Sequence, residues 1–165
     1  VGMGYPGKLT ALKFNQHNLE KSLKKADVVV GAILVPGTTA PTLVSRDLVK
    51  EMKDDSVIVD VSIDQGGIFE TSRGTTHEDP TYVEEGVLHY CVTNMPGAVP
   101  RTSTIALTNS TIPYAIDLAN KGFENAVNED PVLAKGVNVY KGDITYEPVA
   151  DAHDLDYTPL EKAMA

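Results

Sequence analysis

Three largely apolar runs dominate the hydrophobic pattern of the chain, at residues 28–34, 57–61 and 87–93. Each run is followed by a polar loop that contains glycine or proline. Apolar runs of this kind suit strands that are buried on both faces, as in parallel sheets. The pattern therefore predicts three adjacent strands that run in the same direction.

Helical signals lie between these runs. Asn15 or Asn18 can cap a helix. Its apolar residues share one face: Leu19, Leu23 and Ala26. Residues 45–52 predict a second, short helix that begins at a serine, and residues 9–14 predict a further strand.

The repeated order of strand, loop and helix is typical of an α/β fold with a doubly wound parallel sheet. In open parallel sheets, ligands bind outside the carboxyl ends of the strands. We therefore expect a cofactor cleft over the loops that follow the three runs.

From residue 102 onward the pattern becomes helical. A helix over 102–121 would carry an apolar stripe made of Ile105, Ile112, Ile116 and Ala119. Pro113 should kink or interrupt this helix, and Gly122 should end it. A short helix at 131–135 and a hairpin over 137–147 follow, and the tail from residue 151 has weak helical signals.

Charge and composition exclude several classes of function. The net charge is −9, from 14 basic and 23 acidic residues, and no basic cluster is present, which argues against nucleic-acid binding. No apolar run is long enough to span a bilayer, and the start of the chain has no signal-peptide pattern. The only cysteine, Cys91, excludes an intramolecular disulfide and fits a cytoplasmic protein.

Clustered glycines near the start of the chain are a poor candidate for a phosphate-binding loop. Gly2, Gly4 and Gly7 have no predicted strand before them, and Pro6 lies where the following helix should begin. A dinucleotide-binding loop needs both a preceding strand and a helix N-terminus.

Asp64 is the most informative single residue. It follows the second run, which already ends in Asp60, and it precedes Gln65, Gly66 and Gly67. These glycines allow positive φ or close approach of the backbone to a ligand. The Asp64 carboxylate could bond a ribose hydroxyl or hold a cationic amine, and a simple turn cap is an equally good interpretation.

Other loop residues are weaker candidates. Asn94 could bond a carboxamide and Met95 could pack on a flat ring, although a turn with a buried methionine is the simpler interpretation. Ile33 and Leu34 could form an apolar floor for a base, or belong to the core. The four histidines lack metal-ligand spacing, so we expect no metal site.

Four longer motifs make the chain resemble the alanine dehydrogenase family. They are AILVPG at 32–37, SVIVDVSIDQGG at 56–67, NMPGAVPRTSTIALTN at 94–109 and GDITYE at 142–147. They occur in family order from about residue 8 to the C-terminus. Members of that family interconvert L-alanine and NAD with pyruvate, ammonium and NADH, and they assemble as homohexamers.

The resemblance implies a division of the chain. Residues 1–100 would be the C-terminal half of a Rossmann-type NAD-binding domain. Residues 101–165 would be a long linking helix, followed by the C-terminal segment of the catalytic domain with its small hairpin. The catalytic histidine, the substrate-binding lysine and arginine and the glycine loop of the family lie in its N-terminal part. The chain alone is therefore expected to be inactive.

The resemblance also implies site residues. Asp64 matches the active-site aspartate of the family. The positions that match cofactor-lining residues are Ile33, Leu34, Val61, Ser62, Ile63, Asp64, Val92, Thr93, Asn94 and Met95. Arg73 matches a cofactor contact of some members only. Phe14 stands where the family often has serine, which puts that contact with the adenosine side in doubt.

Two alternatives remain at this point. The NAD-binding subunit of proton-translocating transhydrogenase shares the fold and a similar loop at 34–37, but its relatives lack an aspartate at the position of Asp64. The chain by itself could also be a non-catalytic NAD-binding module.

Overall fold

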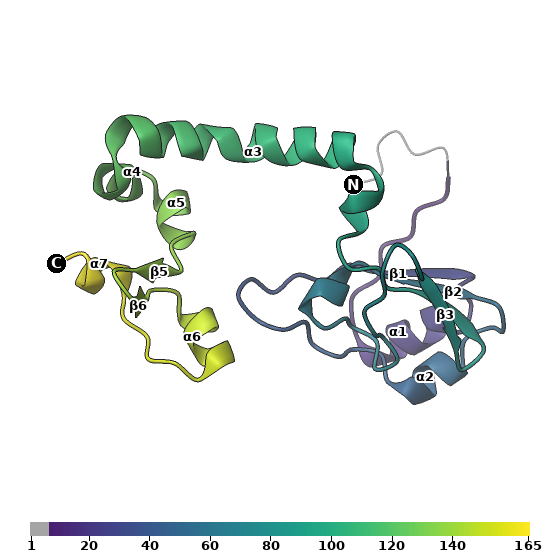
Figure 1. Cartoon of the computed structure of the whole chain (residues 1–165). Helices are drawn as coiled ribbons and strands as arrows, with labels where there is room; N and C mark the ends of the chain where they lie inside the picture. Colours follow the sequence, from purple (N-terminus) through teal and green to yellow (C-terminus); the bar gives the residue numbers. More distant parts are fainter. Residues whose placement is uncertain (1–6) are drawn as a thin grey trace. The chain divides into compact units, whose positions relative to one another are not determined.

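A four-stranded sheet forms the centre of the first of two units in the computed structural model, which describes residues 7–165 (Figure 1). The first unit comprises the described residues up to 32 together with 41–63 and 67–92. The second unit comprises 33–40, 64–66 and 93–165. Of the clustered glycines, Gly2 and Gly4 lie outside the described residues, so our interpretation of that segment stays a prediction.

The sheet has the strand order β1-β2-β4-β3. Its strands are β1 (Val28–Gly31), β2 (Val57–Asp60), β3 (Thr81–Glu84) and β4 (Val87–Tyr90). β1 pairs with β2 and β2 pairs with β4, both in parallel. The prediction of three adjacent parallel strands is confirmed, and each strand is shorter than the apolar run that contains it.

β3 was not predicted from the sequence. It pairs antiparallel with β4 through a two-residue turn at Glu85 and Gly86, whose φ angles are 53° and 76°. Positive φ at both positions is typical of tight hairpins, in which glycine is favoured. Across the two strands, the Tyr82 ring stacks on the His89 ring with their centroids 4.9 Å apart.

Both helix starts of the first unit follow the predicted caps. In α1 (Gln16–Leu23), the Asn15 side chain accepts a hydrogen bond from the Asn18 backbone N–H at 2.8 Å. In α2 (Arg46–Lys50), the Ser45 hydroxyl accepts from the Leu48 N–H. Capping by the side chain of Asn or Ser satisfies backbone donors that the helix itself leaves without a partner.

The predicted strand at residues 9–14 is wrong. The structure gives this segment no regular secondary structure, and the side chains of Leu9, Leu12 and Phe14 are exposed. A strand exists only through pairing of its backbone with a neighbour, and no described strand pairs with this segment.

Full burial is confined to one face of the sheet. Ile58 and Val87 are fully buried there, and Val49 of α2 is fully buried with them in the first unit. On β1, the alternate residues Val28 and Val30 are 58% and 62% exposed. The prediction of strands buried on both faces is therefore wrong for β1, because no described element covers that side of it.

The second unit contains one long helix, α3 (Pro100–Lys121), preceded by the short 3₁₀ helix η2 (Met95–Ala98). α3 ends at Gly122 as predicted, with φ at 74°. We expected Pro113 to kink or interrupt this helix, and α3 continues through Pro113 without interruption. The proline deprives only the Asn109 carbonyl of its donor, and α3 has no buried residue, so water can hydrate that carbonyl.

The apolar stripe predicted on α3 is exposed on this helix, where Ile105, Ile112 and Ile116 are each about half exposed. No described helix is both long enough and apolar enough to cross a bilayer.

The remainder of the second unit consists of short elements. They are α4 (Phe123–Glu129), α5 (Pro131–Lys135), β5 (Val139–Tyr140), β6 (Asp143–Ile144), α6 (Glu147–His153) and α7 (Leu160–Ala163). The predicted helix at 131–135 and the predicted hairpin are confirmed. Lys141 and Gly142 form the hairpin turn with φ of 50° and 102°. Phe123 stacks on Tyr140 with ring centroids 5.0 Å apart.

We predict that Ile58→Ala lowers the free energy of unfolding by about 2–5 kcal/mol, because it removes a fully buried side chain and leaves a cavity. Val28→Ala on the neighbouring strand is the control and should cost less than about 1 kcal/mol, because that side chain is largely exposed. Denaturant unfolding of the two variants measures the difference. Equal losses of unfolding free energy in the two variants would contradict the finding that only one face of the sheet is fully buried.

Candidate functional site

The carboxyl ends of β1, β2 and β4 meet at one edge of the sheet. The register places Gly31 beside Asp60 and Val59 beside Tyr90. The segments that follow these strands therefore leave the sheet at the same edge, where ligands of open α/β sheets bind. All the predicted site residues except Arg73 lie in these three segments.

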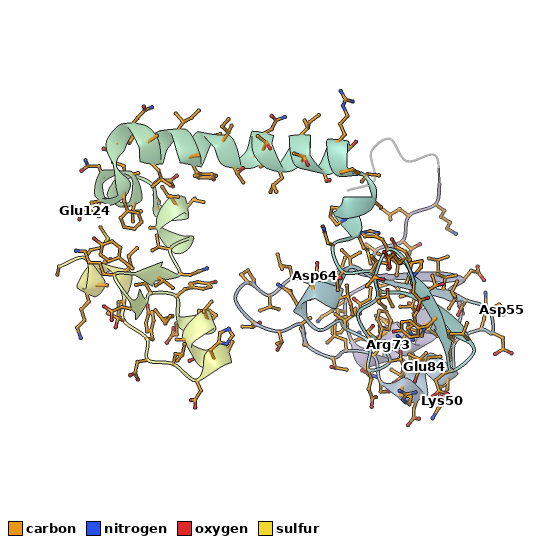
Figure 2. All side chains as sticks on the ribbon, in the orientation of Figure 1. Lys50, Asp55, Asp64, Arg73, Glu84 and Glu124 are labelled. Carbon is orange, nitrogen blue, oxygen red and sulfur yellow. The ribbon has the colours of Figure 1, made fainter. Side chains whose placement is uncertain are left out.

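Asp64 and Asn94 meet although they come from different loops. Asp64 lies in η1 (Val61–Gln65), a 3₁₀ helix that follows β2 directly. Its Oδ1 accepts a hydrogen bond from the backbone N–H of Asn94 at 3.3 Å. Both residues are exposed in the second unit, so a ligand can reach both. Figure 2 shows the side chain of Asp64. The predicted proximity of the two residues is confirmed.

Asn94 has the left-handed backbone conformation, with φ 56° and ψ 49°. Asparagine tolerates this conformation better than most residues other than glycine. The Asn94 carbonyl then accepts a hydrogen bond from the Gly97 N–H at 2.8 Å, which closes the turn of η2. This hydrogen bond fixes the backbone at Asn94, and the residue itself is exposed.

A fully buried carboxylate, Asp60, lies at the end of β2. Its Oδ1 accepts from the Ser62 N–H at 3.1 Å. Its Oδ2 accepts from the Ile68 N–H at 2.8 Å and from the Ser72 hydroxyl at 2.7 Å. Sequence reasoning gave Asp60 no role, although an aspartate inside an apolar run is itself a signal, since a buried carboxylate needs hydrogen-bond donors.

Both glycines after Gln65 adopt positive φ, at 101° for Gly66 and 81° for Gly67. The two differ in their surroundings. A Cβ atom on Gly67 would lie 2.6 Å from Asp60 Oδ2, whereas a Cβ on Gly66 would meet nothing within 4 Å. Both glycines therefore have the positive φ that the sequence allowed. Only at Gly67 would a side chain also collide with a neighbouring residue.

The remaining predicted site residues differ in how exposed their side chains are. Leu34 is 71% exposed and Val61 is 49% exposed, so their side chains can contact a ligand. Thr93 is also exposed, and Ile33 and Met95 are half-buried. The side chains of the other three are buried, which leaves only their main-chain atoms for a ligand: Ser62, Ile63 and Val92.

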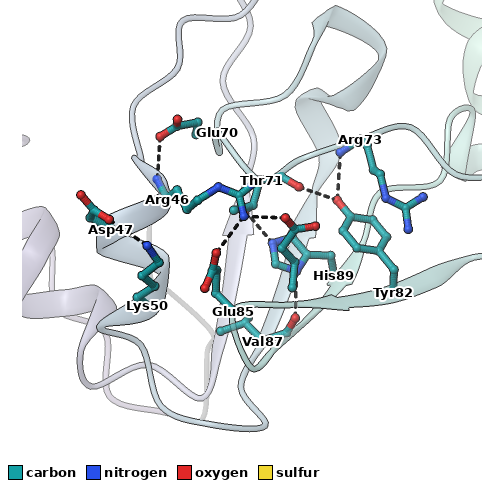
Figure 3. Close-up of polar contacts among 11 residues, drawn as sticks. Arg46, Asp47, Lys50, Glu70, Thr71, Arg73, Tyr82, Glu85, Val87 and His89 are labelled. Carbon is teal, nitrogen blue, oxygen red and sulfur yellow. Dashed lines mark hydrogen bonds and ion pairs between the residues drawn. The ribbon is translucent and has the colours of Figure 1, made fainter.

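Arg73 makes its contacts with β3. Its guanidinium lies 3.8 Å from the centre of the Tyr82 ring, and its backbone N–H donates to the Tyr82 hydroxyl at 2.9 Å (Figure 3). The same hydroxyl donates to the Thr71 carbonyl at 2.8 Å, and burial raises the pKa of Tyr82. Phe14, the position where the sequence departs from the family pattern, is 65% exposed.

His89 is buried, and both of its ring nitrogens have hydrogen-bond partners. Its Nδ1 donates to the Val87 carbonyl at 2.9 Å, so Nε2 is left to accept from the Thr71 hydroxyl at 2.8 Å (Figure 3). Burial lowers the pKa of His89, which favours this neutral form. Among the described residues, no group of His, Cys, Asp and Glu side chains could hold a metal ion.

A groove of about 710 Å³ adjoins Asn94 within the second unit. It is lined by Pro96 and Gly97 of η2 and by residues of the N-terminal half of α3, among them Ser103, Thr104 and Leu107. The lining combines apolar carbon with hydroxyl groups, which suits a small organic ligand that is partly apolar.

The fold is that of an α/β domain with a mostly parallel sheet. Residues 3–147 match the family described as "Alanine dehydrogenase/PNT, C-terminal domain". The chain belongs to this family.

Similar proteins agree with this assignment. The chain is 58% identical over 161 residues to an alanine dehydrogenase of Methanococcus maripaludis and 54% identical over 161 residues to one of Staphylococcus haemolyticus. Each match covers 97% of this chain and 43% of the relative. A solved structure of an L-alanine dehydrogenase is 48% identical, with a TM-score of 0.71, over 86% of this chain and 39% of that one. The chain thus spans less than half the length of the relatives it matches.

We predict that Gly66→Ala lowers the free energy of unfolding by roughly 1–3 kcal/mol, through backbone strain alone. Gly67→Ala should cost clearly more, because the same strain is joined by a collision with the Asp60 carboxylate. Thermal or denaturant unfolding of the two variants measures this order. A smaller loss for Gly67→Ala would show that the Asp60 contact is soft.

Proposed function

We propose that this chain is part of an NAD-dependent L-alanine dehydrogenase, which converts L-alanine reversibly to pyruvate and ammonium. The observation that carries the proposal is the Asp64–Asn94 pair at the carboxyl edge of the sheet, in a chain whose relatives are alanine dehydrogenases. A carboxylate and an amide side chain exposed together are the groups that an amino-acid substrate and a nicotinamide require.

NAD fits the residues present at this edge. Leu34 and Val61 offer exposed apolar surface for a ring, and the Asn94 side chain can bond the carboxamide. Ser62, Ile63, Val92 and Thr93 would contribute main-chain atoms, and Ile33 and Met95 would contribute half-buried apolar side chains. The cofactor, when bound, accepts the hydride from the alanine Cα. Arg73 remains a weaker candidate, since its guanidinium stacks on Tyr82.

Asp64 would act on charge. The ammonium group of alanine first loses a proton to the base, and hydride loss from the neutral amine then places positive charge on the nitrogen of the iminium product. A carboxylate held at the rim can orient the amine and stabilise that charge in the transition state. Within residues 7–165, the hydrogen bond from the Asn94 N–H orients the carboxylate and leaves lone pairs of both oxygens for the substrate.

The complete protein would supply the rest of the site. By its resemblance to the family, we assign residues 1–100 to the C-terminal half of the NAD domain and 101–165 to the linking helix and the C-terminal segment of the catalytic domain. The histidine that transfers the proton and the glycine loop for the pyrophosphate would come from the N-terminal part. A homohexamer in the cytoplasm is the assembly and location we propose.

We predict that Asp64→Asn in the complete protein lowers kcat for alanine oxidation about 100-fold or more, because one preorganised charge contact is typically worth that much in the transition state. The Kd for NAD should change less than about threefold, which calorimetry measures. Asp55→Asn changes an exposed aspartate in the turn before β2, and this matched control should retain full turnover. Near-normal turnover of the Asp64→Asn variant would leave Asp64 as a turn residue.

We also predict that the 165-residue chain by itself forms no NADH from alanine and binds NAD at least about 100-fold more weakly than the complete protein. Most dinucleotide affinity depends on a pyrophosphate held by a glycine loop at a helix N-terminus, and we identify none here. Alanine-dependent NADH formation and calorimetric titration test both statements on the two proteins. Alanine-independent NAD binding by a complete protein without turnover would favour a transhydrogenase subunit or a non-catalytic NAD-binding module.

A further inference from the structure

Asp60 is a carboxylate for which the proposed reaction has no direct use. It is the last residue of β2, and its side chain is fully buried. Leaving an ionised carboxylate in the core is costly unless donors surround it. Three donors do so here, from Ser62, Ile68 and Ser72, at 2.7 to 3.1 Å.

These donors lie on both sides of Asp64 in the sequence. Ser62 precedes it by two residues, and Ile68 follows it by four. The backbone N–H groups of both residues converge on the two oxygens of one side chain. A further bond, from the Gly67 N–H to the Ser62 carbonyl at 3.0 Å, joins the two ends directly. Asp60 therefore fastens the two ends of the turn that carries Asp64.

The local backbone shows that the turn is shaped around this carboxylate. Gly67 has positive φ, and its missing Cβ leaves the space that Asp60 Oδ2 fills. The Ser72 hydroxyl donates a hydrogen bond to the same oxygen. An asparagine has the same size, but one of its two terminal atoms is an NH₂ group that cannot accept a hydrogen bond. Substitution would therefore place a donor against the donors of Ser62 or of Ile68 and Ser72.

We propose that Asp60 is a positioning residue for alanine oxidation: by binding the main-chain N–H groups of Ser62 and Ile68, it fixes the turn that presents Asp64 to the substrate. This proposal rests on the proposed function of Asp64. A displacement of about 1 Å at a reacting group can cost about 100-fold in rate, so loosening the turn should be felt in turnover.

The test is a double-mutant cycle in the complete protein. Asp60→Asn should lower kcat about 10- to 100-fold, with the Kd for NAD within about threefold of its original value. In a protein that already carries Asp64→Asn, adding Asp60→Asn should change kcat less than about twofold, because the contact that it aligns is already gone. Asp55→Asn is again the control, and should leave kcat unchanged in both backgrounds.

A role in stability alone predicts a different result, namely the same fractional loss of kcat with or without Asp64. That outcome would overturn the positioning role, as would full turnover of Asp60→Asn. Ser72→Ala serves if Asp60→Asn does not fold. It removes one of the three hydrogen bonds and should lower kcat about 2- to 5-fold with Asp64 present, and by less than about 1.5-fold in the Asp64→Asn background. Equal losses in both backgrounds would again overturn the proposal.

The cycle also separates the two claims. If Asp64→Asn itself keeps full turnover, the proposed function of Asp64 fails, and the positioning role fails with it. If Asp64→Asn is impaired while Asp60→Asn acts independently of it, only the positioning role fails. Hydrogen exchange over residues 61–68 gives a third readout, and Asp60→Asn should raise its rate at least about tenfold. Unchanged exchange there would show that Asp60 does not hold the turn.

Discussion

The parallel pairing of β1, β2 and β4 is the constraint on which the candidate site depends. Parallel strands point their carboxyl ends to one edge, so residues that are some thirty positions apart in the sequence emerge side by side. β2 and β4 are neighbours in this sense, and Asp64 and Asn94, which follow them in the chain, contact each other. Reversing either strand would move one of the two residues to the opposite edge. β3 runs the other way, and it supports β4 through the stacking of Tyr82 on His89 instead of adding a loop to the site.

Features that depend on neighbours in the sequence could be predicted, and those that depend on partners in space could not. The cap at Asn15, the helix end at Gly122 and the hairpin turn at Gly142 each follow from the local chemistry of one or two residues. The failed strand at 9–14 has the right composition but no pairing partner in the described fold. β3 was not predicted because the strand has only four residues and half of them are polar. The Glu85–Gly86 turn could have indicated the hairpin.

The candidate site divides in the same way. Asp64 and Asn94 could be chosen because each follows a strand directly, and the rule that ligands bind at strand ends needs no coordinates. Exposure could not be predicted, and it decides which of the chosen residues offer a side chain to a ligand: Val61 does, whereas Val92 is buried. The contacts of Asp60 extend to Ser72, twelve residues further along the chain, and no periodicity or spacing announces them.

Asp60 and Asp64 lie at the end of the same strand and carry the same type of side chain, but the two side chains are used in opposite ways. The hydrogen-bonding capacity of a carboxylate is limited to about four lone pairs. Asp60 commits three of them to the protein, and its burial excludes any ligand. Asp64 is exposed, with one hydrogen bond recorded to its carboxylate, from the Asn94 N–H. A group that must act on a substrate needs free lone pairs and a fixed position. These two demands conflict, because hydrogen bonds to the group would fix its position but would occupy its lone pairs. Placing the bonds on a neighbouring carboxylate that holds the backbone resolves the conflict, since the turn is made rigid while the acting oxygens stay available.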